Sequence, residues 1–229
     1  MILMSDLLDF PFVTDFSGEK LVSLRNMESI AVDETRSRIA SKSEYFCFVR
    51  ETVSDMLREA SERLPQGYRF LVKEGYRPAS IQERSFNRVL EAYKNRYADK
   101  TESELYTIVS RYVAPIRVAG HPTGGAIDVT LMKNGTEVFM GTEFNDEPDE
   151  TENRTYLNAE NITREEHELR TILAKALGGA GFVNYPPEWW HWSFGDKYWA
   201  YRTAERVKYE SIRDDEIPEI GRASCRERV

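Results

Sequence analysis

The spacing of apolar residues predicts two helices in the first half of the chain. Between residues 44 and 64 apolar side chains recur at intervals of three and four, which is the pattern of a helix that buries one face. Leu64-Pro65-Gln66-Gly67 should end this helix, because proline and glycine both interrupt helical hydrogen bonding. A second helix is expected from about Ser80 to Tyr97, after a turn at Gly75-Tyr76-Arg77-Pro78.

Two further helices are predicted by the way they begin. At 101–104 and again at 163–166 a threonine stands three residues before a glutamate. In such a capping box each side chain accepts a hydrogen bond from a backbone amide that the helix leaves free. We expect these helices to run to about residue 113 and to residue 177, where Gly178-Gly179 follow.

Strands are predicted where β-branched and aromatic residues cluster or alternate with polar ones. The expected strands cover 68–72, 126–131, 138–141, 182–185 and 189–194. In 126–131 the alternation places apolar side chains on one face, and Asp128 with Thr130 on the other. Asn134-Gly135 favours a tight hairpin turn before 138–141.

The order of these elements predicts one α+β domain. Hairpins mixed with separate helices favour a mainly antiparallel central sheet with flanking helices over a doubly wound parallel sheet. No internal repeat or Pro- or Ser-rich linker divides the chain, so we expect a single domain over 1–218. The stretch 219–229 is similar to a translated DNA-sequencing adapter and is expected to be non-native, with a native basic extension as the alternative. Without it only Cys47 remains, so no intrachain disulfide is expected.

The composition argues against several classes of protein. Of 229 residues, 41% are hydrophobic and 31% are charged, as in an ordinary globular protein. A net charge of -8 argues against general binding to nucleic acid or anionic lipid, and no apolar run approaches the ~18 residues of a membrane span. The segment before Lys20 carries acidic but no basic side chains, unlike a secretory signal, so a cytoplasmic location is expected.

Two of the three histidines lie in patterns that favour metal binding. His121 begins a loop that contains proline and glycine, and Asp128 follows on the strand 126–131. A tight loop of this kind can turn His121 towards the face that carries Asp128. A neutral imidazole and a carboxylate are both ligands of Zn²⁺, and a carboxylate in the middle of an apolar strand needs such a partner.

His191 lies among the four tryptophans of the chain, which all fall between residues 189 and 199. These should form a bulky apolar wall that raises the pKa of the nearby Glu188 and suits it to act as a general base. Glu188 and His191 would face opposite sides of an ideal strand, so they converge only if the Pro186-Pro187 entry or a bulge bends the segment. Two histidines with one carboxylate leave an open coordination position, as in hydrolytic zinc sites.

Each half of this pattern also has a plainer interpretation. The spacing of His121 and Asp128 alone is weak evidence of a metal pair, and a histidine in a Trp-rich strand is more often part of the packing. The two halves together are far more specific than either one. The third histidine, His167, stands in a run whose order does not match the His-Glu-x-x-His zinc motif, so we expect a solvated helix residue there.

Four motifs of the chain are shared with one known family. They are His-x-x-Gly-x-Ala-x-Asp at 121–128, Glu-Trp-Trp-His at 188–191, Gly-Tyr-Arg-Pro at 75–78 and Met-Gly-Thr-x-Phe at 140–144. In these motifs the chain resembles the D-alanyl-D-alanine dipeptidases, including the vancomycin-resistance type, which are related to D,D-carboxypeptidases. The matching blocks run from about residue 68 to residue 194, over half of the chain.

The resemblance implies a zinc peptidase with a hedgehog/D,D-peptidase-like fold and a small dipeptide such as D-alanyl-D-alanine as its substrate. It implies that His121, Asp128 and His191 hold one Zn²⁺ per chain. It also implies that Glu188 is the acid/base and that Arg77, which as an arginine before proline would otherwise be read as a surface residue, stabilises the developing oxyanion.

The chain also departs from the family pattern. Serines that precede the first histidine in the family are replaced by Ala119 and Gly120, and an aspartate after the Met-Gly block is replaced by Asn145, with Asp146 as its expected substitute. One alternative is a D,D- or L,D-carboxypeptidase acting on cell-wall peptides, although such enzymes typically have proline where Trp189 stands. The other is a catalytically silent zinc- or peptide-binding protein, although a structural zinc site would need no base at Glu188.

Overall fold

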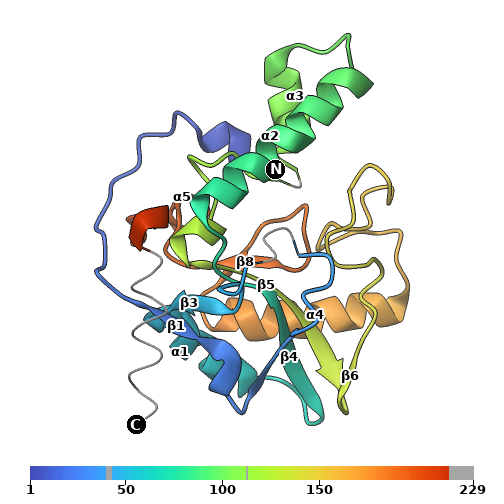
Figure 1. The fold of residues 1–229 in the computed structure, drawn as a ribbon. Coiled ribbons are helices and arrows are strands. Elements are labelled where there is room, and N and C mark those ends of the chain that lie inside the picture. Colours follow the sequence, from blue (N-terminus) through green and yellow to red (C-terminus); the bar gives the residue numbers. More distant parts are fainter. Residues whose placement is uncertain (40–42, 112, 217–229) are drawn as a thin grey trace.

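The computed structural model describes residues 1–39, 43–111 and 113–216 (Figure 1). The predicted non-native stretch 219–229 and the end of the predicted domain at 218 lie outside the described residues. Within the described ranges, no helix is both long enough and apolar enough to cross a membrane.

A six-stranded sheet forms the centre of the fold. Five strands lie side by side in the order β2-β4-β5-β8-β7, and β6 forms a hairpin with β5. The strands are β2 (Ile30–Val32), β4 (Tyr68–Glu74), β5 (Ala126–Lys133), β6 (Thr136–Glu137), β7 (Val183–Asn184) and β8 (His191–Ser193). The α+β class is therefore confirmed. The predicted mainly antiparallel sheet is confirmed only in part, because β2 runs parallel to β4 and the sheet is mixed.

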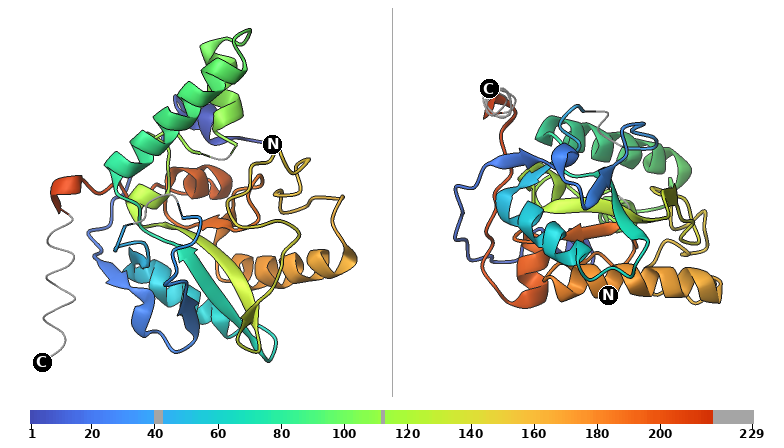
Figure 2. Two further views of the ribbon diagram at one scale, coloured as in Figure 1. Left: turned by 45° about the vertical axis from the view of Figure 1, so that its right-hand side comes forward. Right: turned by 90° about the horizontal axis from the view of Figure 1, so that it is seen from below.

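Helices surround this sheet on two sides. They are α1 (Glu51–Ser61), α2 (Ala79–Arg96), α3 (Glu102–Val109), α4 (Arg164–Gly179) and α5 (Lys197–Thr203). The short 3-10 helices are η1 (Met4–Leu7), η2 (Leu24–Asn26), η3 (His121–Thr123) and η4 (Asp214–Glu216). Figures 1 and 2 show α1 and α4 alongside the sheet, whereas α2 and α3 form a pair that projects away from it. The smaller strands β1 (Leu21–Ser23) and β3 (Phe48–Arg50) form a separate antiparallel pair.

Several local predictions are confirmed in the structure. The apolar face of β5 is fully buried through Ile127, Val129 and Leu131, in the same core as apolar residues of α1 and α4. Both capping boxes form, and they open α3 and α4. The Asn134-Gly135 turn has positive φ angles of 53° and 87°, as the tight primed turns require.

The first predicted helix begins later than its apolar pattern indicates. Residues 48–50 form β3, and α1 starts only at Glu51. The carbonyl groups of Phe46 and Phe48 accept hydrogen bonds from the amides of Gly75 and Tyr76, beyond the end of β4. Pairing with distant backbone therefore outcompetes the helix in this apolar run.

Other elements are shorter than predicted or displaced. The helix α3 ends at Val109 rather than near residue 113, and β6 covers 136–137 rather than 138–141. The Val138 amide still donates to the carbonyl of Leu131 at 3.0 Å. The chain then leaves the sheet through Gly141, which has a φ of +99°.

Candidate metal centre

Three neighbouring strands place polar residues in one row across the sheet. In the antiparallel register Glu74 of β4 is the partner of Asp128 of β5, and Asp128 is the partner of His191 of β8. All three side chains are buried. The sheet itself therefore brings Asp128 and His191 together, although they are far apart in the sequence.

The helix η3 brings His121 to the same carboxylate. Gly124 ends this short helix in the left-handed conformation, with a φ of +73°, and so reverses the chain before β5 begins. Nδ1 of His121 lies 2.7 Å from the carbonyl oxygen of Gly75. Because a carbonyl only accepts, Nδ1 carries a proton, and Nε2 is the ring nitrogen that faces Oδ2 of Asp128, which is 3.3 Å away.

A turn before β8 makes Glu188 and His191 converge. The Glu188 amide donates to the carbonyl of Tyr185 at 3.0 Å, and the His191 amide donates to the carbonyl of Glu188 at 3.2 Å. This turn contains Pro186-Pro187, which stops the strand from extending further back. As a result, Oε2 of Glu188 lies 3.8 Å from Nδ1 of His191.

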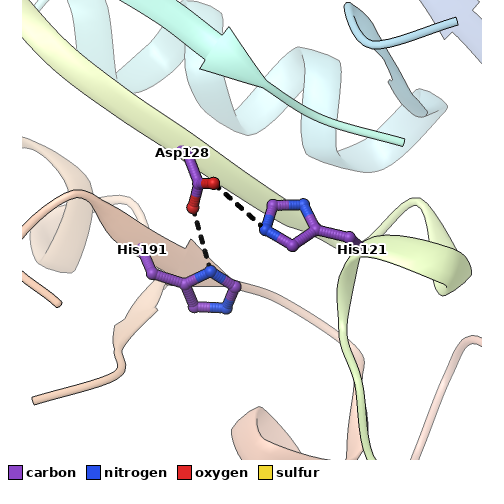
Figure 3. Close-up of side chains that lie close together, drawn as sticks. All are labelled: His121, Asp128 and His191. Carbon is purple, nitrogen blue, oxygen red and sulfur yellow. Dashed lines mark hydrogen bonds and ion pairs between the residues drawn. The ribbon is translucent and has the colours of Figure 1, made fainter. Parts of the chain in front are cut away.

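His121, Asp128 and His191 form a cluster whose geometry fits a zinc ion (Figure 3). Their ligand atoms all lie within 4.8 Å of one another. Oδ2 of Asp128 is 3.3 Å from Nε2 of His121, and Oδ1 is 3.0 Å from Nδ1 of His191. Zinc–ligand bonds of roughly 2.0–2.1 Å in a tetrahedron place the ligand atoms about 3.3 Å apart, so the distances from Asp128 to the two imidazoles are close to those of a zinc site.

Burial and neighbouring charges act differently on the two carboxylates of the site. Burial alone would raise the pKa of Asp128, but the imidazoles of His121 and His191 outweigh it and hold that pKa well below its usual range. Burial raises the pKa of Glu188 well above its usual range, and the charge of Asp128 raises it further, while Arg77 lowers it. Asp128 is thus kept ionised, which suits a ligand of a cation, whereas Glu188 has a raised affinity for a proton, which suits a general base.

Arg77 is buried and held by an ion pair that the sequence pattern did not predict. Its Nε and Nη2 donate to the two carboxylate oxygens of Glu74 at 3.0 and 2.7 Å, and its Nη1 donates to Oε1 of Gln82 at 2.7 Å. Burial would raise the pKa of Glu74, but Arg77 outweighs it and the pKa is lowered. The available sequence signal was a glutamate at the end of an apolar strand, three residues before an arginine.

A cavity of about 290 Å³ lies beside the cluster. Its wall contains all five residues singled out by sequence, namely His121, Asp128, His191, Glu188 and Arg77. His167 lies elsewhere, half-buried on α4 beside a separate shallow depression. The structure therefore brings together the five expected residues and leaves the third histidine apart from them.

The predicted tryptophan wall beside Glu188 is only partly present, because no tryptophan of the described chain lines the cavity but Trp190 contacts Glu188. Trp189, Trp190 and Trp192 are buried in the main hydrophobic core, and Nε1 of Trp189 donates to Thr142 at 2.9 Å. The side chain of Trp190 donates a hydrogen bond to the carboxylate of Glu188, which lowers the pKa of that group, so this tryptophan opposes the upward shift that was expected of the wall. The apolar lining comes from other parts of the chain instead, including Met4 and Tyr185.

The acidic loop places Asn145 and Glu147, and not Asp146, at the cavity wall. Asp146 forms an ion pair with Arg38 and accepts a hydrogen bond from the Glu143 amide at 2.9 Å. The carboxylate of Asp146 therefore bonds to groups of the protein outside the cavity wall. The expectation that Asp146 substitutes for the family's aspartate at position 145 is not supported. Glu147, which accepts from the hydroxyl of Tyr93 at 3.1 Å, is the carboxylate that this loop gives to the cavity.

Comparison with known proteins connects this site with one peptidase family. Residues 30–209 match the peptidase family described as D-Ala-D-Ala dipeptidase. The D-alanyl-D-alanine dipeptidase of Synechocystis sp. is 27% identical over 172 residues, which cover 66% of this chain and 70% of the relative. The D-alanyl-D-alanine dipeptidase of Enterococcus faecalis is 31% identical over 155 residues, covering 64% of this chain and 73% of the relative. A crystal structure of a mutant of the vancomycin-resistance D,D-pentapeptidase VanY, in complex with Zn(II), aligns with a TM-score of 0.43 at 18% identity, covering 80% of this chain and 85% of that one.

Replacing Glu74 by glutamine should strongly destabilise the protein, because it removes the carboxylate that accepts two hydrogen bonds from the buried guanidinium of Arg77. We expect the free energy of unfolding, measured by urea denaturation, to fall by roughly 3–5 kcal/mol. Glu83→Gln, at an exposed position on α2, is the matched control and should change it by less than about 0.5 kcal/mol.

The same variant makes a prediction about pH. Because folding lowers the pKa of Glu74, the stability that its charge contributes is present above the unfolded pKa of about 4.3 and is lost as the pH falls through the folded value. The stability difference between wild type and Glu74→Gln should therefore shrink in acid. An equal stability of the Glu74→Gln and Glu83→Gln variants at neutral pH would show that the ion pair is not required.

Proposed function

The chain belongs to the D-Ala-D-Ala dipeptidase family, in agreement with the resemblance of its motifs, and we propose that it is a zinc-dependent dipeptidase that hydrolyses D-alanyl-D-alanine or similar small dipeptides. The observation that carries the proposal is the convergence on one cavity of a His-Asp-His cluster, a carboxylate of raised pKa and a buried arginine. Each of these groups has a part to perform in peptide hydrolysis.

His121, Asp128 and His191 would hold one zinc ion per chain. Zinc bound by three protein ligands is a Lewis acid with an open coordination position, which is the chemistry that peptide hydrolysis needs. The chain prepares these ligands for a cation. The carbonyl of Gly75 fixes the proton of His121 on Nδ1, and the low pKa of Asp128 keeps its carboxylate ionised.

Glu188 would serve first as the base and then as the acid. Its carboxylate borders the cluster, with Oε2 3.8 Å from Nδ1 of His191. The raised pKa allows it to take a proton from the attacking water and afterwards to donate that proton to the leaving amine. A carboxylate with the usual pKa of about 4.3 would hold the proton too weakly for the second step.

Arg77 would stabilise the negative charge that develops on the scissile carbonyl oxygen. Its guanidinium lines the cavity, and Glu74 and Gln82 fix its plane, so it need not reorganise when the charge appears. An arginine carries five N–H groups. The three bonds to Glu74 and Gln82 therefore leave donors for the oxyanion.

The size and the charges of the cavity favour a dipeptide. Its volume of about 290 Å³ lies just below the roughly 300–1,000 Å³ of typical small-molecule sites, which suits a small substrate. Glu147 offers the wall a carboxylate for the ammonium end of a dipeptide, and Arg88 on α2 offers a guanidinium for the carboxylate end. Both charged ends of a free dipeptide thus have a partner of opposite sign.

The location and partners of the enzyme are inferred from its composition and its thiol. Cys47 is buried and unpaired in the described part of the chain, which fits a reducing compartment, and we propose a cytoplasmic location on that ground. The net charge of -8 disfavours nucleic acid as a partner. A small peptide is therefore the partner that we propose.

A panel of peptides tests the proposed function directly. The zinc-loaded protein should show a higher kcat/KM for D-Ala-D-Ala than for a pentapeptide that ends in D-Ala-D-Ala. Discrimination against L,D- and L,L-dipeptides should be incomplete, because Asn145 is uncharged and leaves Glu147 as the one carboxylate of this loop at the cavity, and a charge-assisted contact is typically worth ~10- to 150-fold. Faster release of D-alanine from the pentapeptide than from any dipeptide would contradict the proposed dipeptidase activity and support the carboxypeptidase alternative.

Replacing Glu188 by glutamine should separate catalysis from metal binding. We expect kcat to fall by on the order of a hundredfold or more, the usual scale for a general base, while the zinc content stays unchanged. Glu165→Gln, at an exposed position on α4, controls for the loss of one negative charge and should change neither quantity. If Glu188→Gln releases zinc, Glu188 is a ligand and the assignment of roles is wrong.

A further inference from the structure

One of the residues that line the cavity comes from near the start of the described chain. Met4 lies in η1 and lines the cavity together with Tyr185, Glu188 and His191. The match to the dipeptidase family begins only at residue 30, so this part of the wall comes from outside the matched region. The motifs of the family therefore contain no information about it.

Apolar contacts hold η1 in place. Leu3, Met4 and Leu7 are buried, with exposed fractions of 7%, 1% and 2%. They form a hydrophobic cluster of their own with Tyr185 and Tyr198, among others. The segment thus docks on the aromatic residues behind the cavity and not on the main core.

Hydrogen bonds fix the position of η1 more closely. The Met4 amide donates to the hydroxyl oxygen of Tyr185 at 3.5 Å, and that hydroxyl donates to the carbonyl of Ser110. The hydroxyl of Ser110 donates to the hydroxyl oxygen of Ser5 at 2.9 Å. Met4 is therefore tied to Tyr185 by its backbone, and it lines the same cavity as the predicted base, Glu188.

We propose that Met4 determines substrate specificity by limiting the size of the side chains that the cavity accepts. This inference rests on the proposed function. A thioether fixed against the cavity occupies volume that a larger substrate side chain would need. An apolar group of this kind excludes large side chains by steric contact alone, without any hydrogen bond. Met4 would thereby make the enzyme favour substrates with alanine-sized side chains. This contact would limit the cavity where no tryptophan of the described chain lines it.

Truncation and enlargement of Met4 test the inference in opposite directions. Met4→Ala should raise the kcat/KM for D,D-dipeptides with a leucine-sized side chain, relative to D-Ala-D-Ala, by roughly tenfold or more, the scale on which one or a few methylene groups discriminate in an apolar site. Met4→Phe should lower the same ratio. Two series of substrates, enlarged at the amino or at the carboxyl residue, identify the side chain that meets Met4.

Leu7→Ala is the matched control, because Leu7 is buried in the same cluster and on the same short helix without lining the cavity. It should cost stability as Met4→Ala does and leave the ratio of kcat/KM values within about twofold of wild type. Because the ratio cancels the amount of folded enzyme, loss of stability does not move it. A ratio that is unchanged in both Met4 variants, or that changes equally in Leu7→Ala, overturns the inference. A wild-type protein that hydrolyses no dipeptide overturns instead the proposed function on which it rests.

Discussion

A buried carboxylate between two imidazoles is the interaction on which the rest of the site depends. Asp128 is only 3% exposed, and an ionised carboxylate in that position is costly unless it has close partners. The register of β5 with β8 supplies His191, and the reversal at Gly124 supplies His121. A strand pair and a short helix must therefore both be placed correctly before Asp128 can stay charged.

The neighbouring charges point to a cation at the same place. Glu74, Asp128 and Glu188 are all buried and interact electrostatically with the guanidinium of Arg77. The negative charge of each carboxylate raises the pKa of Arg77. One cation facing three carboxylates leaves an excess of negative charge in a region of low dielectric. A divalent cation bound by His121, Asp128 and His191 would offset that excess.

The sequence predicted the residues of the site better than their surroundings. Residue types and spacing were enough to predict that His121, Asp128 and His191 cluster, because only a few side chains bind metals and the loop and strand that carry these three are recognisable locally. Glu74 was missed because its role comes from its position beside Asp128 in the sheet. The tryptophans were predicted less well, because the turn before β8 buries them in the main core and leaves Trp190 in contact with Glu188 but not with the cavity. The strand Phe48–Arg50 was read as helix because its partners are distant in sequence.

The most direct test of this account is the zinc content of purified protein after dialysis, measured by atomic spectroscopy for the wild type and for two histidine variants. The account predicts about one zinc per chain in the wild type and in His167→Ala, because His167 lies apart from the cluster. It predicts almost none in His191→Ala, which loses one of three ligands. Retention of one zinc by His191→Ala, or a wild type that binds no zinc, would contradict it.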